Sequence, residues 1–292
     1  MDAMQGGDTV IKMPTPKKVA AIHDLSGFGR CSLTVIIPVM SAMGIQVCPV
    51  PTAVLATHTG GFGEVIMKDL TDFIPAALGK YKELGIEFDA VYSGFLASAE
   101  QVSHCLDFFK SYPDSLKVVD PVMGDHGRLY STYTGALCAK MSELAKVADV
   151  ITPNLTEAAI LLGEEYPSAL TDDMAKDWLG RLREFAETVV ITGVFMTDGR
   201  IVNIGADKSG CWSVDCDYVP ESYPGTGDLF TSVLTASLLK NDRLPVAVKR
   251  AAEFVQAAVK NTFNGGKSKE PPRNGINFEE VLPALFSNKN FL

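Results

Sequence analysis

The segment Gly225-Thr226-Gly227-Asp228 stands directly before an apolar run, Leu229–Leu239, that predicts a helix. Glycines at a helix start let backbone N–H groups approach a ligand, because no side chain blocks them. Those N–H groups have no partner inside the helix, and the helix dipole adds positive potential there. The segment therefore predicts a site for developing negative charge, such as a phosphoryl group during its transfer.

Asp228 places a carboxylate beside this predicted anion site, which is unfavourable unless the carboxylate has a task. Taking a proton from an alcohol is such a task, so we predict that Asp228 is a general base. The alternative is a glycine-rich turn in which Asp228 is only the acid of a helix start. The rest of the chain decides between these two interpretations.

Short apolar runs alternate with helical patterns along the chain. Strands are predicted at 19–23, 47–50, 90–93, 117–120, 150–152 and 188–192, with hairpin partners at 200–204 and 210–215. Helices are predicted at 32–43, 65–81, 99–111, 134–146, 155–162, 172–187, 228–239, 245–262 and 278–286, and glycine-bearing turns or loops at 25–29 and 57–63. This order predicts an α/β fold, a three-layer α/β/α arrangement with a central, mostly parallel sheet.

Composition limits both the organisation and the function. Residues 17–292 are predicted to form one domain, because no composition break or internal repeat divides them. Residues 1–16 are polar and irregular, and are predicted to be a disordered leader or a remnant of cloning. No run of about 18 apolar residues occurs, so we expect no membrane span.

Charge and cysteine usage exclude further classes. A net charge of −9 argues against a nucleic-acid-binding surface, which needs clustered lysine and arginine. The six cysteines form no C-x-x-C and no zinc pattern. We expect them to be reduced thiols of a cytoplasmic protein.

Polar, turn-prone residues follow four of the predicted strands. They are His23–Ser26, Asp120–Asp125, Thr152–Glu157 and Thr192–Gly193. Ligands of open parallel sheets bind beyond the carboxyl ends of the strands, so we expect these residues to share one rim. Acidic residues grouped there would suit magnesium, which prefers oxygen ligands and keeps most of its waters.

Each of these motifs also has a purely structural interpretation. The Asp120-Pro and Thr152-Pro pairs could simply end strands, since X-Pro favours a turn. Asn154 and Glu157 could form only a capping box at a helix start. Asp125 could be an exposed turn acid. Convergence on one predicted rim favours the functional interpretation.

Three motifs, in this order, resemble those of the ribokinase-like superfamily: Asp120-Pro-Val-Met-Gly-Asp125, Thr152-Pro-Asn-Leu-Thr-Glu157 and Gly225-Thr-Gly-Asp228. Within it the chain resembles the pyridoxal kinase branch, from about Val19 to about Thr262. The resemblance implies the ribokinase-like fold and transfer of phosphate from ATP to a hydroxymethyl group, with Mg²⁺. It leaves a requirement for a monovalent cation open.

The resemblance also implies roles for individual residues. Asp228 matches the catalytic base, and the backbone of Gly225, Thr226 and Gly227 matches the anion hole. Residues of the nucleotide and metal side match in three pairs: Asn154 with Glu157, Asp120 with Asp125, and Thr192 with Gly193. The resemblance implies that Asn154 and Glu157 organise magnesium and phosphates, usually through water. It implies that Asp120 and Asp125 line the nucleotide and metal side, and that Thr192 and Gly193 border the triphosphate. Asp120 and Glu157 are the metal residues expected here.

The substrate end carries the choice of branch. Ser26 is similar to the serine turn that meets the pyridine ring, and Thr52 and His58 lie in a segment similar to the one ending in a His-Thr pair. Phe95 stands where the branch has tyrosine, which loses a hydroxyl but keeps ring stacking. The structural alternatives are a turn serine for Ser26 and a core or loop histidine for His58.

The implied function is phosphorylation of the 5′-hydroxymethyl group of pyridoxal, pyridoxamine or pyridoxine in cytoplasmic vitamin B6 salvage, by a homodimer. The nearest alternative is hydroxymethylpyrimidine kinase, whose typical Gly-Gly-Ala-Gly run fits Ser26–Ser32 poorly. A dinucleotide oxidoreductase would need a third glycine where Ser32 stands. A non-catalytic vitamin-binding protein would be expected to have lost the base or the anion hole, and both are intact.

Overall fold

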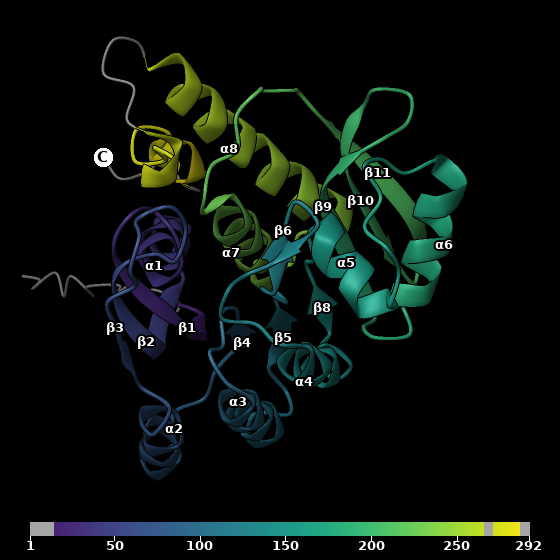
Figure 1. The fold of residues 1–292 in the computed structure, drawn as a ribbon. Coiled ribbons are helices and arrows are strands. Elements are labelled where there is room, and N and C mark those ends of the chain that lie inside the picture. The colour runs from purple at the N-terminus through teal and green to yellow at the C-terminus, as the bar shows by residue number, and fades with distance from the viewer. Residues whose placement is uncertain (1–14, 266–270, 287–292) are drawn as a thin grey trace, which may run out of the picture.

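A nine-stranded sheet forms the centre of the computed structural model, which describes residues 15–265 and 271–286. The strand order is β11-β10-β9-β8-β5-β4-β1-β2-β3 (Figure 1). The strands are β1 (Lys18–Phe28), β2 (Gln46–Thr57), β3 (Met67–Asp69), β4 (Ala90–Ser93), β5 (Leu116–Val119), β8 (Val150–Ile151), β9 (Thr188–Phe195), β10 (Ile201–Asp207) and β11 (Gly210–Cys216). A separate two-stranded hairpin consists of β6 (Gly124–Asp125) and β7 (Arg128–Leu129).

The neighbouring strands β2, β1, β4, β5, β8 and β9, in the order in which they lie in the sheet, pair in parallel. Only the two edges of the sheet are antiparallel. At one edge β10 pairs antiparallel with β9 and with β11, which confirms the predicted hairpin. At the other edge the short β3 runs antiparallel to β2. The carboxyl ends of all the parallel strands therefore lie on one rim.

Helices cover both faces of the sheet, as Figure 1 shows. One face carries α2 (Phe73–Glu83), α3 (Ala99–Ser111), α4 (Gly135–Ala145), α5 (Leu155–Leu162) and α6 (Asp172–Leu182). The other carries α1 (Leu33–Ala42), α7 (Thr226–Leu239) and α8 (Leu244–Asn264). Each layer of helices buries its own apolar cluster against the sheet. The predicted three-layer α/β/α fold is confirmed.

The turn predicted at residues 25–29 is wrong. Leu25, Ser26 and Phe28 continue β1 and pair in parallel with β2. A Cβ on Gly27 would lie 3.0 Å from the carbonyl oxygen of Ala56, so the glycine serves close strand contact instead of a turn. As a result, β1 carries Ser26 further along the rim than a turn would.

Two helix predictions were also wrong. The helix expected at 65–81 begins only at Phe73, because Met67–Asp69 gains backbone pairing with Ala53–Leu55 as β3. The helix expected at 278–286 is reduced to a 3₁₀ turn, η3 (Leu282–Leu285). Pro283 lies inside that segment and lacks the N–H that a longer α-helix would need.

The ends of the chain are described only in part. The predicted leader, residues 1–16, lies outside the described residues except for exposed Thr15 and Pro16. A 3₁₀ turn, η2 (Pro272–Asn274), lies after α8 in the chain, and Gly275 next to it forms an isolated bridge with Arg30, just beyond the end of β1. Within the described ranges, no helix is both long and apolar enough to span a membrane.

Candidate active site

The amino end of helix α7 lies at the rim and is open to a ligand. Gly225 precedes the helix in the left-handed region, with φ 89°, a conformation that glycine adopts without strain. Among the described residues, no side chain caps this helix end. The backbone N–H groups of Thr226 and Gly227 therefore have no side-chain cap, and their role in binding an anion remains a prediction.

Asp228 lies in the first turn of α7 and is only 8% exposed. Its Oδ2 accepts a hydrogen bond of 2.7 Å from the backbone N–H of Ser32. Ser32 has φ 59°, which is uncommon for a residue with a side chain. Strained backbone of this kind clusters at functional sites. The hydrogen bond from Ser32 holds Oδ2 of Asp228, so that Oδ1 faces other groups.

Three side chains of β1 form a series of contacts that begins at Oδ1 of Asp228. The Nε2 atom of His23 lies 3.1 Å from that oxygen. The other ring nitrogen, Nδ1, lies 2.9 Å from Oδ1 of Asp24. The hydroxyl of Ser26 donates to Oδ2 of Asp24 over 2.7 Å. All four side chains are buried, so these contacts are shielded from water.

In this series of contacts, the positive charge of His23 and the negative charges beside it stabilise one another. Burial alone would lower the pKa of His23, but the close carboxylates of Asp228 and Asp24 outweigh burial and raise it to about 10. Burial alone would raise the pKa of Asp24, but His23 holds it below its usual range. His23 is therefore an imidazolium between two carboxylates at neutral pH.

Asp120 follows β5 on the same rim and is 6% exposed. Burial, and next the charge of Asp228, raise the pKa of Asp120 to about 7. Burial, and next the charge of Asp120, also raise the pKa of Glu157 well above its usual range. Asp120 thus lies close enough to Asp228 and to Glu157 for negative charge to accumulate there, as expected where a cation is to be bound.

The predicted Asn-x-x-Glu element joins two parts of the rim. Asn154 and Glu157 form a complete capping box at the start of α5, so the structural alternative is also true. In addition, the side-chain amide of Asn154 donates to the carbonyl of Gly124 over 2.8 Å. The backbone N–H of Met123 donates to Oε1 of Glu157 over 3.1 Å. The motif at 152–157 therefore holds the motif at 120–125 in place.

These residues fit a magnesium ion held through water. Both oxygens of Glu157 already accept backbone N–H groups, at Met123 and Asn154, so Glu157 suits an outer position. Asp120 is the buried carboxylate beside it whose ionisation a divalent cation would favour. In the part of the chain that the structure describes, no three metal-ligating side chains form a direct protein cage. Mg²⁺ commonly keeps several waters and needs no such cage.

Asp125 lies on the hairpin of β6 and β7, next to these carboxylates. Its Oδ1 accepts the backbone N–H of His126, and Gly127 N–H donates to Thr156 on α5 over 2.9 Å. His126 and Gly127 both have positive φ, 49° and 73°, as a tight two-residue hairpin turn requires. The loop that follows Asp125 is thus a short hairpin attached to α5.

Thr192 and Gly193 lie in the second half of β9, beside Asn154. The N–H of Thr192 donates to the carbonyl of Pro153 over 2.9 Å, and Gly193 N–H donates to Oδ1 of Asn203. Gly193 has φ 62°, so the strand bends there. The structure thus brings the predicted triphosphate border next to the Asn-x-x-Glu element.

The predicted substrate residues lie further along the rim. Thr52 donates to the carbonyl of Phe95 over 3.1 Å, and both residues are buried. The ring of Phe95 packs edge-on against Tyr133, with centroids 6.1 Å apart, within the apolar cluster of the α2–α6 face. The hydroxyl of Ser26 donates its hydrogen bond to Asp24. The substrate roles of Thr52, Phe95 and Ser26 remain predictions.

His58 belongs to a second group of contacts. Its Nε2 lies 2.6 Å from the carbonyl oxygen of Arg273, and its Nδ1 accepts the N–H of Gly60. Phe62 packs edge-on against its ring at 4.9 Å, and the Arg273 guanidinium lies over the Phe62 ring. His58 thus joins the loop after β2 to η2, and its predicted contact with substrate remains a prediction.

His23, Asp24 and Ser32 were not among the predicted site residues. The sequence places His23 and Asp24 at the end of a buried strand, and that rim position was the available signal. The contacts of His23 and Ser32 with Asp228 join residues about 200 positions apart, which no local pattern reports. Ser32 contributes through its backbone, so its residue type gives no signal.

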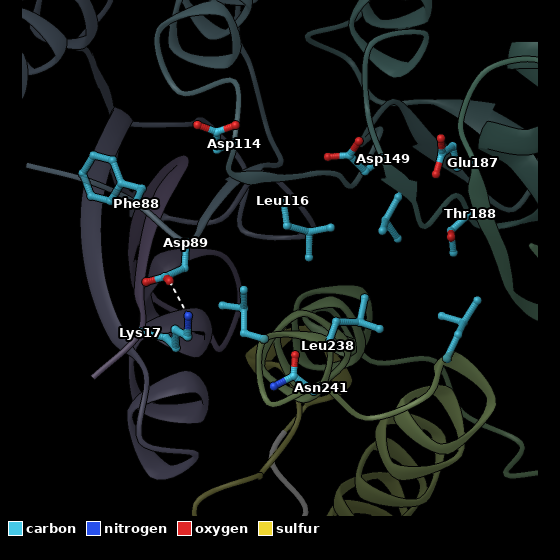
Figure 2. A pocket seen from close by; sticks show the side chains of 13 residues that line it. Lys17, Phe88, Asp89, Asp114, Leu116, Asp149, Glu187, Thr188, Leu238 and Asn241 are labelled. Carbon is cyan, nitrogen blue, oxygen red and sulfur yellow. Dashed lines mark hydrogen bonds and ion pairs between the residues drawn. The ribbon is translucent and has the colours of Figure 1, made fainter. Parts of the chain in front are cut away.

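A cavity of about 600 Å³ lies away from this rim. Figure 2 shows its lining, with Lys17 and Asp89 forming an ion pair of 2.7 Å. The lining comes from the amino ends of β4, β5, β8 and β9 and from the carboxyl end of α7. The cavity is therefore at the edge of the sheet opposite to Asp228, and we do not assign the candidate active site to it.

Comparison with known proteins places this geometry in context. The sequence profile of the phosphomethylpyrimidine kinase family matches residues 37–273. A candidate phosphomethylpyrimidine kinase from Bacteroides thetaiotaomicron, solved with pyridoxal, is 43% identical, with a TM-score of 0.87 over 93% of this chain and 96% of that chain. Pyridoxal kinase from Lactobacillus plantarum is 30% identical, with a TM-score of 0.85 over 93% and 97%. Hydroxymethylpyrimidine/phosphomethylpyrimidine kinase from Haemophilus influenzae is 28% identical over 89% of this chain and 97% of that protein.

Proposed function

The chain belongs to the phosphomethylpyrimidine kinase family, and on this premise we propose that it phosphorylates the 5′-hydroxymethyl group of a B6 vitamer with ATP. Membership of this family makes the protein a phosphotransferase that acts on an alcohol group. The observation that carries the proposal is the uncapped start of α7, with the buried carboxylate of Asp228 in its first turn. Pyridoxal, pyridoxamine and pyridoxine all present the alcohol that such a base requires.

Asp228 accepts the proton of the hydroxymethyl group as that oxygen attacks the γ-phosphorus, and the bond from the γ-phosphorus to the bridging oxygen breaks so that ADP leaves. The contact with Ser32 N–H holds one carboxylate oxygen, so that the carboxylate has a defined orientation before substrate arrives. Charge on the equatorial oxygens of the moving phosphoryl group is met by the N–H groups of Gly225, Thr226 and Gly227. Positioned donors of this kind suit phosphoryl transfer, which depends mainly on alignment and charge neutralisation.

The nucleotide side is assigned to the residues joined by the capping box of α5. Asn154 and Glu157, with Asp120 and Asp125, would hold Mg²⁺ through water, while Thr192 and Gly193 would border the triphosphate. When bound, the metal would neutralise phosphate charge. Asp120 and Glu157 contribute buried negative charge, which favours a cation at this end of the rim.

The vitamer assignment is supported by a relative and by the sequence at the rim. The Bacteroides thetaiotaomicron protein, 43% identical over most of both chains, was solved with pyridoxal. Residues 26–32 also lack the Gly-Gly-Ala-Gly run typical of hydroxymethylpyrimidine kinases. The second candidate is phosphorylation of hydroxymethylpyrimidine, favoured by the Haemophilus influenzae kinase that matches over almost its full length. We place the vitamer reaction in cytoplasmic B6 salvage and propose a homodimer.

An acceptor panel tests the proposed function. The protein is assayed with MgATP and, in turn, pyridoxal, pyridoxamine, pyridoxine and hydroxymethylpyrimidine, with ADP release coupled to NADH oxidation. We expect kcat/KM for at least one vitamer to exceed that for the pyrimidine by about tenfold or more, as one missing specific contact in a binding pocket would give. A higher kcat/KM for the pyrimidine, or no ADP release with any vitamer, would overturn the vitamer assignment.

A further inference from the structure

His23 sits where the chain can control the carboxylate of Asp228. It lies on β1 at the rim and is 3% exposed. Its Nε2 approaches Oδ1 of Asp228 to 3.1 Å, although the N–H direction is not aligned for a full hydrogen bond. Contacts around catalytic groups are often loose without substrate and tighten when it binds. The other oxygen of Asp228 is already held by Ser32.

The ring of His23 has few orientations open to it. Its Nδ1 lies 2.9 Å from Asp24, and Asp24 is held in turn by the hydroxyl of Ser26 over 2.7 Å. Tyr92 packs edge-on against the ring, with centroids 6.3 Å apart. A Cβ on Gly94 would overlap the ring, so the bare α-carbon of this glycine leaves the space that His23 fills. These contacts keep Nε2 directed toward Asp228.

The charges around His23 come from every side. Asp24 faces it from β1, Asp228 from α7 and Asp120 from the end of β5, while Tyr92 on β4 is a neutral neighbour. Burial, together with the two aspartates 24 and 228, also keeps the nearby thiol of Cys31 protonated. His23 is thus the cation among three carboxyl groups, and it opposes the repulsion between Asp228 and Asp120.

We propose that His23 is a positioning residue for the reaction, holding the Asp228 carboxylate in place through the buried series Ser26–Asp24–His23–Asp228. This inference rests on the proposed role of Asp228 as the base. In many active sites a third group orients the base that activates the nucleophile. Here the base is the Asp228 carboxylate, and the orienting group is the His23 imidazolium. His23 touches neither substrate nor phosphate in this scheme.

The test compares His23→Ala, His23→Gln and the parent protein. With His23→Ala we expect kcat to fall roughly 10- to 100-fold, as displacement of a reacting group does, while KM for ATP changes less than about twofold. The acid limb of kcat/KM should move to higher pH, because the site then lacks the cation that favours negative charge beside it. His23→Gln restores a donor without charge. It should recover much of kcat but leave the acid limb displaced.

His104→Ala on α3 is the matched control, because it removes a histidine outside the site and should leave kcat and the pH profile unchanged. Thermal unfolding and ATP binding establish that each variant is folded. If His23→Ala fails to fold, the comparison uses His23→Gln, whose displaced acid limb is still expected. A folded His23→Ala protein with the kcat and the acid limb of the parent would overturn the proposal.

The test separates this proposal from the proposed function. Each variant is compared with its parent on whichever acceptor the parent prefers, so a preference for hydroxymethylpyrimidine would reject the vitamer but not the role of His23. A measurement without acceptor is ¹⁵N NMR of the imidazole. We expect the His23 signals of the parent to stay those of an imidazolium above pH 8, and in Asp228→Asn to titrate at lower pH. Unchanged titration in Asp228→Asn would also reject the contact.

Discussion

The α-carbon of Gly225 packs against the carbonyl oxygen of Arg30, in space that the Cβ of any other residue would overlap. Gly225 also has φ 89°, so a side chain would add backbone strain of about 1–2 kcal/mol. The contact joins the segment before α1 to the start of α7. It therefore sets the position of the two elements that supply Ser32 N–H and the carboxylate of Asp228.

Gly225→Ala is expected to lower both stability and turnover. The new Cβ must push α7 away from Arg30, which displaces the N–H groups proposed to bind the phosphoryl oxygens. Loss of one such donor typically costs about 10²-fold in kcat. Gly180→Ala, in α6 with open space around its Cβ position, is the matched control and should keep the parent kcat. Parent-level turnover of a folded Gly225→Ala protein would contradict the anion-hole assignment.

Asp228→Asn is expected to abolish most turnover while the fold and ATP binding remain. The amide keeps an oxygen for Ser32 N–H but cannot take a proton, and losing a positioned base costs about 10²- to 10⁴-fold in rate. Single-turnover kinetics and calorimetric ATP titration measure the two effects separately. Asp198→Asn, an exposed acid beside Arg200, serves as the control. Turnover near the parent rate in Asp228→Asn would remove it from the role of base.

Asn154→Ala is expected to weaken the MgATP side of the reaction. The substitution removes the N-cap of α5, at about 1 kcal/mol, and also the contact that holds Gly124. Thr171→Ala removes the N-cap of α6 without touching the rim, so it controls for the stability loss alone. We expect loss of the two caps to lower the unfolding free energy by similar amounts, with a further loss in Asn154→Ala from the Gly124 contact. KM for MgATP should rise only in Asn154→Ala. Equal KM values would reduce Asn154 to a capping residue.

Asp120 should make stability depend on pH and on magnesium. Its pKa is about 7 in the folded protein against 3.8 for the ordinary side chain, so the folded state binds this proton more tightly than the unfolded chain. The free energy of unfolding therefore falls as pH rises between these values. Asp120→Asn should flatten this fall, and Mg²⁺ at about pH 7 should stabilise the parent more than the variant.

Urea unfolding between about pH 5 and pH 7.5, with and without Mg²⁺, measures both effects of Asp120. The difference in unfolding free energy, variant minus parent, should grow with pH when the metal is absent. A difference that stays constant over this range would show that Asp120 does not titrate as its surroundings imply. An equal response of both proteins to Mg²⁺ would argue against Asp120 as a metal residue.

The sequence predicted the parts of the fold that depend on local patterns. The strands at β4, β5 and β8 and the capping box at Asn154 follow from short apolar runs and cap residues, which act within a few positions. The rim followed from the alternation of strands and helices, which predicts parallel strands, and from the polar residues that follow four of those strands. The segment 25–28 was missed because glycines suggest a turn locally, whereas pairing with β2 extends the strand. Likewise, β3 depends on Ala53–Leu55, a partner that the local sequence does not reveal.

The residues of the candidate site could be predicted where they lie together in one sequence motif. They were missed where their role depends on contact between two distant segments. Asp228 and its glycines lie side by side in the sequence. His23 acquires its role only from Asp228, and Ser32 only from a strained backbone that directs its N–H. Asn154 was predicted as a metal-side residue, but its hold on Gly124 appears only in three dimensions.

The missing side chain at Gly94 has a consequence for sequence comparison. The imidazole of His23 fills the space that a Cβ at position 94 would need, so Gly94 cannot gain a side chain while His23 is present. The two positions can therefore be inspected together in any aligned kinase, as a two-letter signature. Where a larger residue replaces the glycine, we expect no histidine at the position of His23, and such enzymes would have to orient their base by other contacts.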